Sequence, residues 1–533
     1  MITFDEVTFT YPDAHAPALA DVGIKIDEGE FFLVVGETGA GKSTLLRAVN
    51  GLVPHFTGGT LLGRVTVDGI STVTPPRELA DRVGVVGQNP SASFVTDTVE
   101  DELAYAMENF GIAPEVMRRR VEDVLDLLGI AALRRRTLGT LSSGEAQRVA
   151  IGSVLTASPR VLVLDEPTSA LDPGAAEDVL AILTRLVDDL GLTVMLAEHR
   201  LERVVQYASR IGVVGADSRV RVGAPEIVMI DAPVAPPVVT LARAAGWTPI
   251  PLSVRDARRV AGGLRERLAS IEPTGRPLPT LGEPVARLKK VAAHYGSNEV
   301  LHGIDVSIAQ GELLAVMGRN GAGKSTLLRL LSGLMRPTSG RVIVEGANPH
   351  ELPAGRLVRS VGLVPSDPGA LLYERTIASE CAVADREHHL APGTTRAALE
   401  RIEPALDPDR HPRDCSEGQR LALALAVILA PAPPLVLLDE PTRGLDYAAK
   451  GRLASILREL AMSGHAVVLA THDVELVAGT ATRAIVIADG EIVSDGPARD
   501  VVCHSPVFAP QVAKILAPGE WLTVAEVSAA LAS

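Results

Sequence analysis

Two short segments of the chain combine glycine, lysine and hydroxyl residues in an arrangement suited to holding phosphate. Residues 36–44 read GETGAGKST and residues 318–326 read GRNGAGKST. Glycines let successive backbone N–H groups face an anion, and a following helix adds the positive end of its dipole. The lysines are expected to reach the outer phosphates of a nucleotide, and Ser43 and Ser325 to hold Mg²⁺. The predicted phosphate-binding residues are Gly36, Gly39, Gly41, Lys42, Ser43, Thr44, Gly318, Gly321, Gly323, Lys324, Ser325 and Thr326.

Paired carboxylates follow an apolar run at two places, once as Asp165-Glu166 and once as Asp439-Glu440. A carboxylate at the carboxyl end of a buried strand faces the ligand crevice of an open α/β sheet. We expect the aspartates to bind Mg²⁺ and the glutamates to polarise a water that attacks a γ-phosphate. The same carboxylates could instead cap the helices that follow.

A histidine follows each pair, and His199 and His472 lie 33 and 32 residues beyond their glutamates. At this distance each could touch the γ-phosphate and report whether it is present. A lone histidine is usually structural, but two at matching positions favour a functional role.

These residues recur because the chain is a duplication. The LDEPT segment that starts at Leu164 returns after 274 residues, and Ser142–Glu145 is answered by Ser416–Gln419 at the same offset. Residues 31–35, 161–164 and 194–197 are short, apolar and rich in β-branched side chains. They predict buried parallel strands that alternate with helices, and therefore an α/β sheet in each half.

The halves resemble ABC-type ATPase domains, and the resemblance covers nearly the whole chain. It implies an α/β fold with two P-loop ABC ATPase domains in one chain. Each domain would be a mostly parallel sheet with helices, plus an antiparallel subdomain and a helical signature subdomain. In this family two domains face head to tail, and each ATP with its Mg²⁺ is held between the phosphate loop of one and the Ser-Gly signature of the other. The resemblance thus implies an intramolecular pseudo-dimer that binds and hydrolyses ATP.

The resemblance also assigns contacts outside the phosphate loops. Each signature would close over the nucleotide of the opposite half, and two tyrosines would stack on adenine. Both signatures depart from the common Leu-Ser-Gly-Gly-Gln but keep its serine and second glycine. The residues are Ser142 and Gly144 over the nucleotide at Lys324, Ser416 and Gly418 over the one at Lys42, and the tyrosines Tyr11 and Tyr295.

The halves differ at the family's glutamine, which touches Mg²⁺ and the attacking water. It is Gln88 in the first half, whereas the ungapped alignment places Ser366 in the second. A serine is too short to reach the same place. We therefore expect the site built on Lys324 to hydrolyse more slowly than the site on Lys42.

Each half is expected to end in a small appendage, because the only two tryptophans, Trp247 and Trp521, are again 274 residues apart. The predicted division is a first ATPase domain (1–230), a first appendage (231–262), a linker (263–284), a second ATPase domain (285–504) and a second appendage (505–533).

Composition excludes several classes of protein. The 533 residues carry a net charge of −14, which repels a nucleic-acid backbone. Three cysteines without C-x-x-C spacing support neither a disulfide framework nor a zinc site. The apolar run from Leu421 to Leu438 is cut by prolines, so a helix, a turn and a buried strand explain it better than a membrane span.

Tandem ATPase halves without membrane spans occur in transporter subunits and in soluble machines that act on ribosomes or DNA. The short linker, acidic charge and few cysteines favour a transporter subunit. Residues 50–59 (NGLVPHFTGG) and 197–202 (AEHRLE) resemble the energy-coupling factor (ECF) class of importers of vitamins, vitamin precursors or metal ions. The alternative is the fused ATPase of a monosaccharide importer. The sequence does not identify the cargo.

The ECF resemblance implies two partners, a transmembrane coupling subunit and a membrane substrate-binding subunit, and a peripheral location on the cytoplasmic face of the membrane. No nucleic-acid partner is expected. Arginines of the coupling subunit would dock near an acidic cluster of the first half. These acids could instead complement a helix dipole. They are Asp97, Glu100, Asp101 and Glu102, with only Glu374 and Glu380 in the second half.

Overall fold

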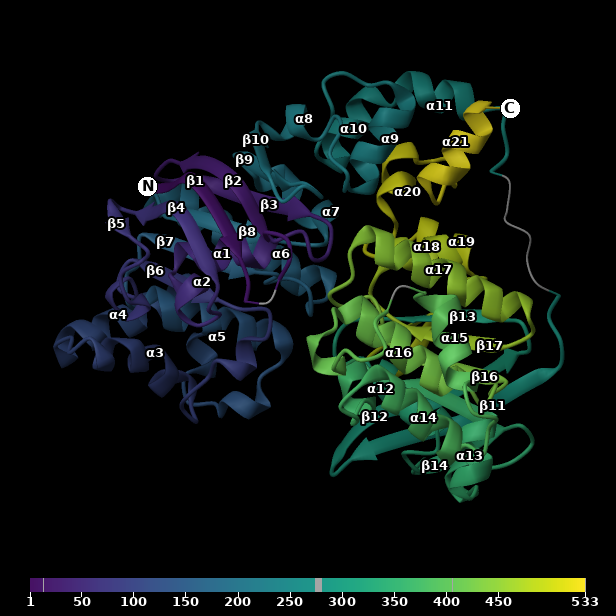
Figure 1. Cartoon of the computed structure of the whole chain (residues 1–533). Helices are drawn as coiled ribbons and strands as arrows, with labels where there is room; N and C mark the ends of the chain where they lie inside the picture. Colours follow the sequence, from purple (N-terminus) through teal and green to yellow (C-terminus); the bar gives the residue numbers. More distant parts are fainter. Residues whose placement is uncertain (13, 274–279, 405, 533) are drawn as a thin grey trace. The chain divides into compact units, whose positions relative to one another are not determined.

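The computed structural model describes residues 1–12, 14–273, 280–404 and 406–532 (Figure 1). The chain divides into two compact units, Met1–Ala257 and Arg258–Ser533. Residues 13, 274–279, 405 and 533 fall within the predicted first domain, linker, second domain and second appendage respectively, and lie outside the described residues.

A small antiparallel sheet opens the first unit. Its strands run in the order β2-β1-β4-β5, and alternate residues of β1 are buried, Ile2 and Phe4 before a register shift and Val7 and Phe9 after it. This alternation is what a sheet with one face on the core requires. The strands are β1 (Ile2–Thr10), β2 (Leu19–Ile26), β4 (Thr60–Val67) and β5 (Ile70–Ser71).

The main sheet of the first unit has the order β10-β9-β3-β8-β7-β6, and every neighbouring pair except β9 with β10 is parallel. All six residues of β3 are buried, as expected for a central parallel strand covered on both faces. The strands predicted over residues 31–35, 161–164 and 194–197 are confirmed. The strands are β3 (Phe31–Gly36), β6 (Val83–Val86), β7 (Val161–Asp165), β8 (Thr193–Ala197), β9 (Arg210–Val214) and β10 (Val220–Gly223).

The second unit repeats this topology. Its main sheet has the order β15-β16-β17-β13-β18-β19, which matches the first sheet strand for strand, and an antiparallel sheet β12-β11-β14 precedes it. The predicted duplication is therefore confirmed in the fold. The strands are β11 (Pro284–Tyr295), β12 (Asn298–Ala309), β13 (Leu313–Met317), β14 (Ser339–Val344), β15 (Val361–Val364), β16 (Leu435–Asp439), β17 (Ala466–Ala470), β18 (Arg483–Ala488) and β19 (Glu491–Pro497).

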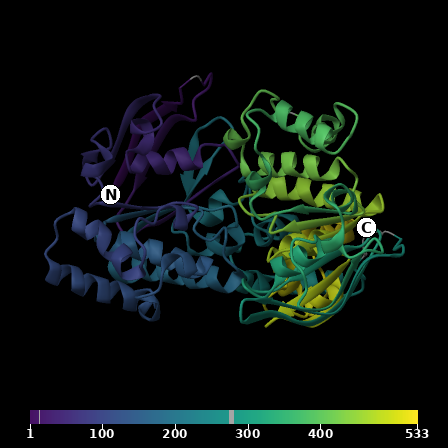
Figure 2. The same cartoon turned by 90° about the horizontal axis from the view of Figure 1, so that it is seen from below.

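Helices connect the strands of both sheets. Within the first unit the blue helices of residues 99–155 form a group separate from the purple N-terminal strands (Figure 2). In the first half the helices are α1 (Lys42–Val49), α2 (Leu52–His55), α3 (Val99–Asn109), α4 (Pro114–Leu127), α5 (Ser143–Leu155), α6 (Pro173–Leu190), α7 (Leu201–Val204), α8 (Pro225–Val228), α9 (Pro237–Ala245), α10 (Val254–Val260) and α11 (Gly262–Leu268).

The second half carries an equivalent set, and its apolar run from Leu421 to Leu438 divides as predicted between α16 and β16. Among the described residues, the structure contains no helix with the length and apolar character needed to cross a bilayer. The helices are α12 (Lys324–Leu331), α13 (Ala354–Ser360), α14 (Ile377–Glu387), α15 (Thr394–Ile402), α16 (Glu417–Leu429), α17 (Tyr447–Met462), α18 (Val474–Thr480), α19 (Ala498–Cys503), α20 (Gln511–Leu516) and α21 (Val524–Ala532).

Helix α11 occupies the start of the segment predicted as a linker. It belongs to the second unit, buries Leu264 and Leu268, and its Arg265 donates from Nη2 to the Ile515 carbonyl of α20 at 2.7 Å. This part of the segment is thus an ordered helix that packs on the second appendage. The five-part division of the chain stays a prediction.

Candidate active site

The two phosphate loops have the same local geometry. Helices α1 and α12 begin at Lys42 and Lys324, so the loops lead directly into helix N-termini. Lys42 Nζ donates to the carbonyls of Gly36 and Glu37 at 3.0 and 2.9 Å. Gly41 has a φ of 107°, and a Cβ there would lie 2.4 Å from the Ala18 carbonyl oxygen. The loop therefore needs glycine at this position.

A serine and an aspartate meet beside each loop. Burial raises the pKa of Asp165 and of Asp439 above the usual range, and the nearby hydroxyls of Ser43 and Ser325 oppose this shift. Within the described residues, Asp439 Oδ1 is buried without a hydrogen-bond partner. A buried carboxylate oxygen of this kind is costly unless a cation satisfies it. Hydroxyl and carboxylate oxygens are also the donors that Mg²⁺ prefers, so these residues fit the ion.

In the first half, Glu166 is contacted by two of the predicted residues. Gln88 Nε2 donates to Glu166 Oε2 at 3.1 Å, and His199 Nε2 lies 3.0 Å from Oε1. Glu166 is left-handed, with a φ of 53°, while its backbone N–H donates to the Ala197 carbonyl at 2.9 Å. Such a conformation in a non-glycine residue often marks a functional site. The structure thus places Gln88, Glu166 and His199, which the sequence assigned to one site, in contact with one another. Their roles stay predictions.

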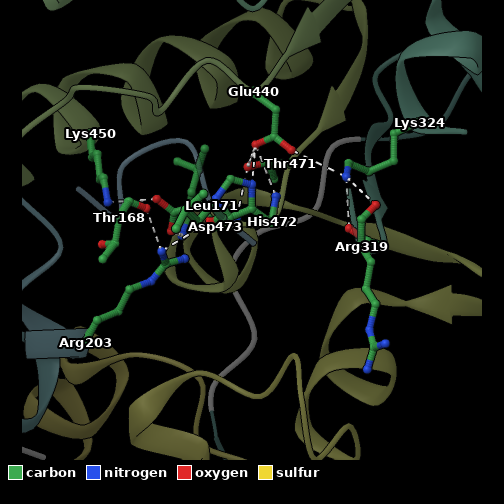
Figure 3. A network of polar contacts seen from close by, with 12 residues as sticks. Thr168, Leu171, Arg203, Arg319, Lys324, Glu440, Lys450, Thr471, His472 and Asp473 are labelled. Atoms are coloured by element: carbon green, nitrogen blue, oxygen red, sulfur yellow. Dashed lines mark hydrogen bonds and ion pairs between the residues drawn. The ribbon is translucent and has the colours of Figure 1, made fainter. Parts of the chain in front are cut away.

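Glu440 in the second half has different partners (Figure 3). His472 Nδ1 lies 2.8 Å from Glu440 Oε2, and Lys324 Nζ lies 3.6 Å from Oε1. Thr471 Oγ1 also donates to Oε2 at 3.4 Å. Ser366, at the position of Gln88, is exposed. The two glutamates are thus held by different sets of neighbours, although Glu440 is also left-handed, with a φ of 49°.

The signature serines cap helices. Ser142 is the N-cap of α5 and forms a capping box with Glu145, which also pairs with Arg136 at 2.9 Å. Ser416 caps α16 in the same way with Gln419. A carboxylate or an amide at the third helical position can complete this box, which explains why the first signature tolerates glutamate. The glycines Gly144 and Gly418 lie in the first turns of these helices. Closure of each signature over the opposite lysine stays a prediction.

The two predicted adenine-stacking tyrosines differ in their surroundings. Tyr11 hydrogen-bonds Thr44 of α1 through its hydroxyl at 2.9 Å and packs edge-on against Phe9. Tyr295 is 45% exposed, and its hydroxyl accepts from Arg329 of α12 at 3.0 Å. Both rings therefore lie near the helix that follows their phosphate loop.

The acidic cluster is not a uniform docking surface. Glu102 is buried, and its Oε2 accepts hydrogen bonds from the backbone N–H groups of Val95 and Thr96 at 3.0 Å each. Glu380 accepts in the same way from Tyr373 and Glu374 in the second half. The expected docking role is therefore wrong for Glu102, which is an internal acceptor that fixes the loop before α3.

The remaining acids of the cluster have other surroundings. Glu100 pairs with Arg134 at 2.8 Å, and its pKa is lowered chiefly by that hydrogen bond. Asp97 and Asp101 are exposed. Among the described residues, they are the two carboxylates of the first-half cluster that are exposed and form no ion pair.

Sequence reasoning missed a set of charged residues behind the glutamates. In the first half, Thr168 Oγ1 donates to the buried Glu198 at 2.5 Å, and Arg203 reaches the same loop. In the second half, Lys450 pairs with Asp473 at 2.8 Å. A comparison of the two halves could have found these residues, because the segments that follow His199 and His472 carry different charged residues.

Comparison with known proteins extends these observations. The ABC transporter family model matches residues 19–169 and 301–443. A relative from Streptomyces avermitilis is 58% identical over 100% of both chains, and one from Methanosarcina mazei is 34% identical over 94% of this chain and 90% of its own. Both carry the name ABC transporter ATP-binding protein.

A solved structure described as a model of ribosome-bound archaeal Pelota and ABCE1 shares the fold. Its TM-score is 0.63 at 22% identity, covering 93% of this chain and 79% of that one. The two ranges that match the family model include both phosphate loops and both pairs of strand-end carboxylates. The chain therefore belongs to the ABC transporter family and carries two ABC ATPase domains in tandem.

Proposed function

We propose that this chain is the ATP-hydrolysing subunit of an ECF-type importer of a vitamin, a vitamin precursor or a metal ion. In this proposal ATP closes the two halves into a head-to-tail pair within one chain, and hydrolysis reopens them. The chain would lie on the cytoplasmic face of the membrane, bound to a transmembrane coupling subunit and a membrane substrate-binding subunit.

The observation that supports catalysis is the contact between glutamate and histidine in each half. His199 lies 3.0 Å from Glu166, and His472 lies 2.8 Å from Glu440. A carboxylate fixed in this way can accept a proton from an attacking water, and the histidine can contact the terminal phosphate. Both halves retain this pair, which supports hydrolysis at both sites rather than binding alone.

The remaining residues have roles that follow from their positions. Lys42 and Lys324 would turn from their loop carbonyls to the outer phosphates, where the helix N-termini also stabilise negative charge. Ser43 with Asp165, and Ser325 with Asp439, would hold Mg²⁺, assisted by Gln88 in the first half only. When bound, Mg²⁺ neutralises charge on the phosphates during transfer.

Single substitutions test the catalytic part of the proposal. Glu166→Gln and Glu440→Gln should each lower ATP turnover while leaving nucleotide binding intact, because the amide cannot take the proton. Phosphate release and binding of a fluorescent ATP analogue measure the two properties separately. Turnover of the Glu166→Gln, Glu440→Gln double variant at the parent rate would contradict the assigned roles.

The ECF assignment rests on two segments of the first half. Residues 50–59 lead from α1 through α2, and residues 197–202 carry His199. Purification of the tagged chain from its own membranes should recover a coupling membrane protein and a small membrane substrate-binding protein. Recovery with a sugar transporter would instead favour the monosaccharide alternative, and recovery with ribosomes would refute membrane transport.

The exposed acids of the first half offer a second test. Charge reversal by Asp97→Lys with Asp101→Lys should release the chain from membranes that contain its partner, since a basic partner would be repelled. Reversal of Asp188 and Asp189, which are exposed on α6, is the matched control. Equal co-sedimentation of both double variants would remove these acids from the interface.

A further inference from the structure

In each half a charged side chain joins the stretch of chain after the glutamate to the segment after the histidine. In the first half this side chain is Arg203 of α7. Its Nη1 donates to the carbonyl of Thr168 at 3.0 Å and to that of Leu171 at 3.2 Å (Figure 3). Arg203 therefore ties α7, which starts two residues after His199, to the loop between Glu166 and α6.

The second half makes the same connection in another way. Lys450, in the first turn of α17, lies 2.8 Å from Asp473, which directly follows His472. The side chains of Lys450 and Asp473 are only 10% and 2% exposed. A buried ion pair is favourable only with good geometry, so these two residues must hold a defined arrangement.

The residues that make these connections are not equivalent in the duplication. Alignment of the two histidines places Leu476 at the position of Arg203, and alignment of Asp172 with Asp446 places Ala176 at the position of Lys450. Leu476 and Ala176 are buried and apolar. Each half thus carries its cation where the other half has an apolar side chain. A similar connection was built twice from different positions, which indicates that the connection itself matters.

Each connection closes a ring that includes the glutamate and the histidine. In the first half the ring runs from Glu166 to His199, along the chain to Arg203, across to Thr168 and back to Glu166. Thr168 Oγ1 and Glu198 add a second crossing of 2.5 Å. In the second half it runs from Glu440 through His472, Asp473 and Lys450. A displacement of about 1 Å in a catalytic group can cost about a hundredfold in rate, so a ring of this kind has a direct use.

We propose that Arg203 in the first half and the Lys450–Asp473 pair in the second are positioning residues for ATP hydrolysis. Arg203 holds the loop after Glu166, and the Lys450–Asp473 pair holds the start of α17, against the histidine segment of the same half. Each thereby fixes the contact between glutamate and histidine. None of these three residues contacts the reacting phosphate in this proposal. The inference rests on the proposed roles of Glu166, Glu440 and the two histidines.

The test for the first half is Arg203→Leu, which installs the residue that the second half has at this position. A Glu440→Gln background restricts turnover to the first half. We expect kcat to fall about tenfold while the KM for ATP stays within twofold, and Arg203→Lys to restore part of the loss. Arg185→Leu, on the exposed surface of α6, is the matched control and should turn over at the rate of its background. An unchanged kcat in folded Arg203→Leu would overturn the proposal.

The second half is tested by Lys450→Ala in a Glu166→Gln background, with Arg458→Leu on the exposed side of α17 as control. We expect a larger loss of kcat than for Arg203→Leu, because the change leaves a buried carboxylate without its partner. Lys450→Met with Asp473→Asn removes both charges, and so preserves the test if the single variant does not fold. Parent-like kcat in this double variant would exclude a positioning role for the pair.

Backbone amide exchange provides a readout that does not depend on catalysis. In nucleotide-free protein, Arg203→Leu should speed exchange at residues 169–171, and the Arg185→Leu control should not. Faster exchange with unchanged kcat would show that the ring orders the loop without serving hydrolysis, which refutes the inference. If Glu166→Gln and Glu440→Gln themselves fail to lower turnover, the proposed function is wrong, and exchange alone then decides whether Arg203 positions the loop.

Discussion

At the scale of single residues, the two halves differ most in what surrounds the glutamate. Gln88 donates to Glu166 Oε2, whereas in the second half Oε2 of Glu440 is contacted by His472 and Thr471. The other oxygen of Glu440 faces Lys324 at 3.6 Å. The amide of Gln88 is thus a donor to the first glutamate, and the residue at its position in the second half, Ser366, is an exposed serine.

This difference predicts the effect of restoring the glutamine. Ser366→Gln in a Glu166→Gln background should raise the turnover of the second half about tenfold, which corresponds to about 1.4 kcal/mol from one hydrogen bond to a charged group. The reciprocal Gln88→Ser in a Glu440→Gln background should lower turnover by a similar factor. Steady-state phosphate release measures both. Equal rates for Ser366→Gln and its background would show that the missing amide does not limit the second site.

Glu198 leads to a prediction about pH. Burial, and to a lesser extent the charge of Glu166, raises the pKa of Glu198 to about 8, while Thr168, Arg203 and Arg200 oppose the shift. The folded chain thus holds a proton that the unfolded chain releases near pH 4.5. The contribution of Glu198 to the free energy of unfolding is constant below that pH. It falls as the pH rises from about 4.5 to about 8, and it changes no further above pH 8.

Glu198→Gln removes this dependence, because the amide resembles the neutral acid. The free energy of unfolding of the variant should gain on that of the parent by up to about 1.4 kcal/mol per pH unit within the window. Thermal unfolding at pH 6, 7 and 8 follows the gain, and Glu177→Gln on the exposed side of α6 is the control. A constant difference across the series would mean that Glu198 is ionised in the fold.

At the scale of elements, the sequence predicted those parts whose causes are local. Strand β3 is apolar throughout, and α1 starts where glycines end, so both could be recognised from a few residues. The left-handed Glu166 and Glu440 could not, because their conformation depends on the hydrogen bond of each N–H to a neighbouring strand. Helix α11 was likewise missed, since its stability comes from packing on α20 rather than from its own seven residues.

The signature helix α5 allows its structural and chemical roles to be separated. Ser142→Ala removes the N-cap and should cost about 1 kcal/mol in stability. Ser142→Asp keeps the cap, because aspartate caps helices about as well as serine, but places a negative charge where the proposal expects phosphate. We therefore expect Ser142→Asp to unfold at a temperature near that of the parent while its ATP turnover falls strongly.

The matched control for this pair is Thr376→Asp, since Thr376 caps α14 and has no proposed role in nucleotide binding. Its turnover should equal that of the parent. Parent-like turnover in Ser142→Asp as well would place the first signature away from any bound nucleotide.

At the scale of the whole molecule, the two copies of the duplication share their sheet topology but differ in the positions of several charged and polar side chains. The two main sheets agree strand for strand, whereas Arg203, Lys450, Gln88 and Glu198 have no chemical equivalent at the matching positions of the other half. Sheet order depends on many apolar contacts, so single substitutions leave it intact. A polar connection depends on one or two side chains and can be rebuilt elsewhere. This is why motif comparison predicted the fold, the phosphate loops and the direct neighbours of the glutamates, but missed Arg203, Lys450 and Glu198 behind them.

The packing of α11 leads to a prediction about the chain after protease cleavage between the two halves. Arg265 donates to the Ile515 carbonyl at 2.7 Å, and a cavity of about 500 Å³ lined by Leu268 and Trp521 lies between α11 and the second appendage. A specific protease site placed within residues 274–279 leaves α11 on the N-terminal fragment. Because α11 packs on α20 of the other fragment, the fragments of the parent should remain together after cleavage and keep their ATP turnover.

Weakening this contact should separate the fragments. Arg265→Ala with Leu268→Asp removes the hydrogen bond and buries a charge, so the cleaved variant should elute as two species in size-exclusion chromatography. Its turnover should fall on dilution, because a covalent tether no longer sets the effective concentration of one half around the other. The uncleaved variant keeps that tether and should turn over ATP at the parent rate. Fragments of the cleaved parent that separate as readily as those of the variant would show that α11 does not hold the halves together.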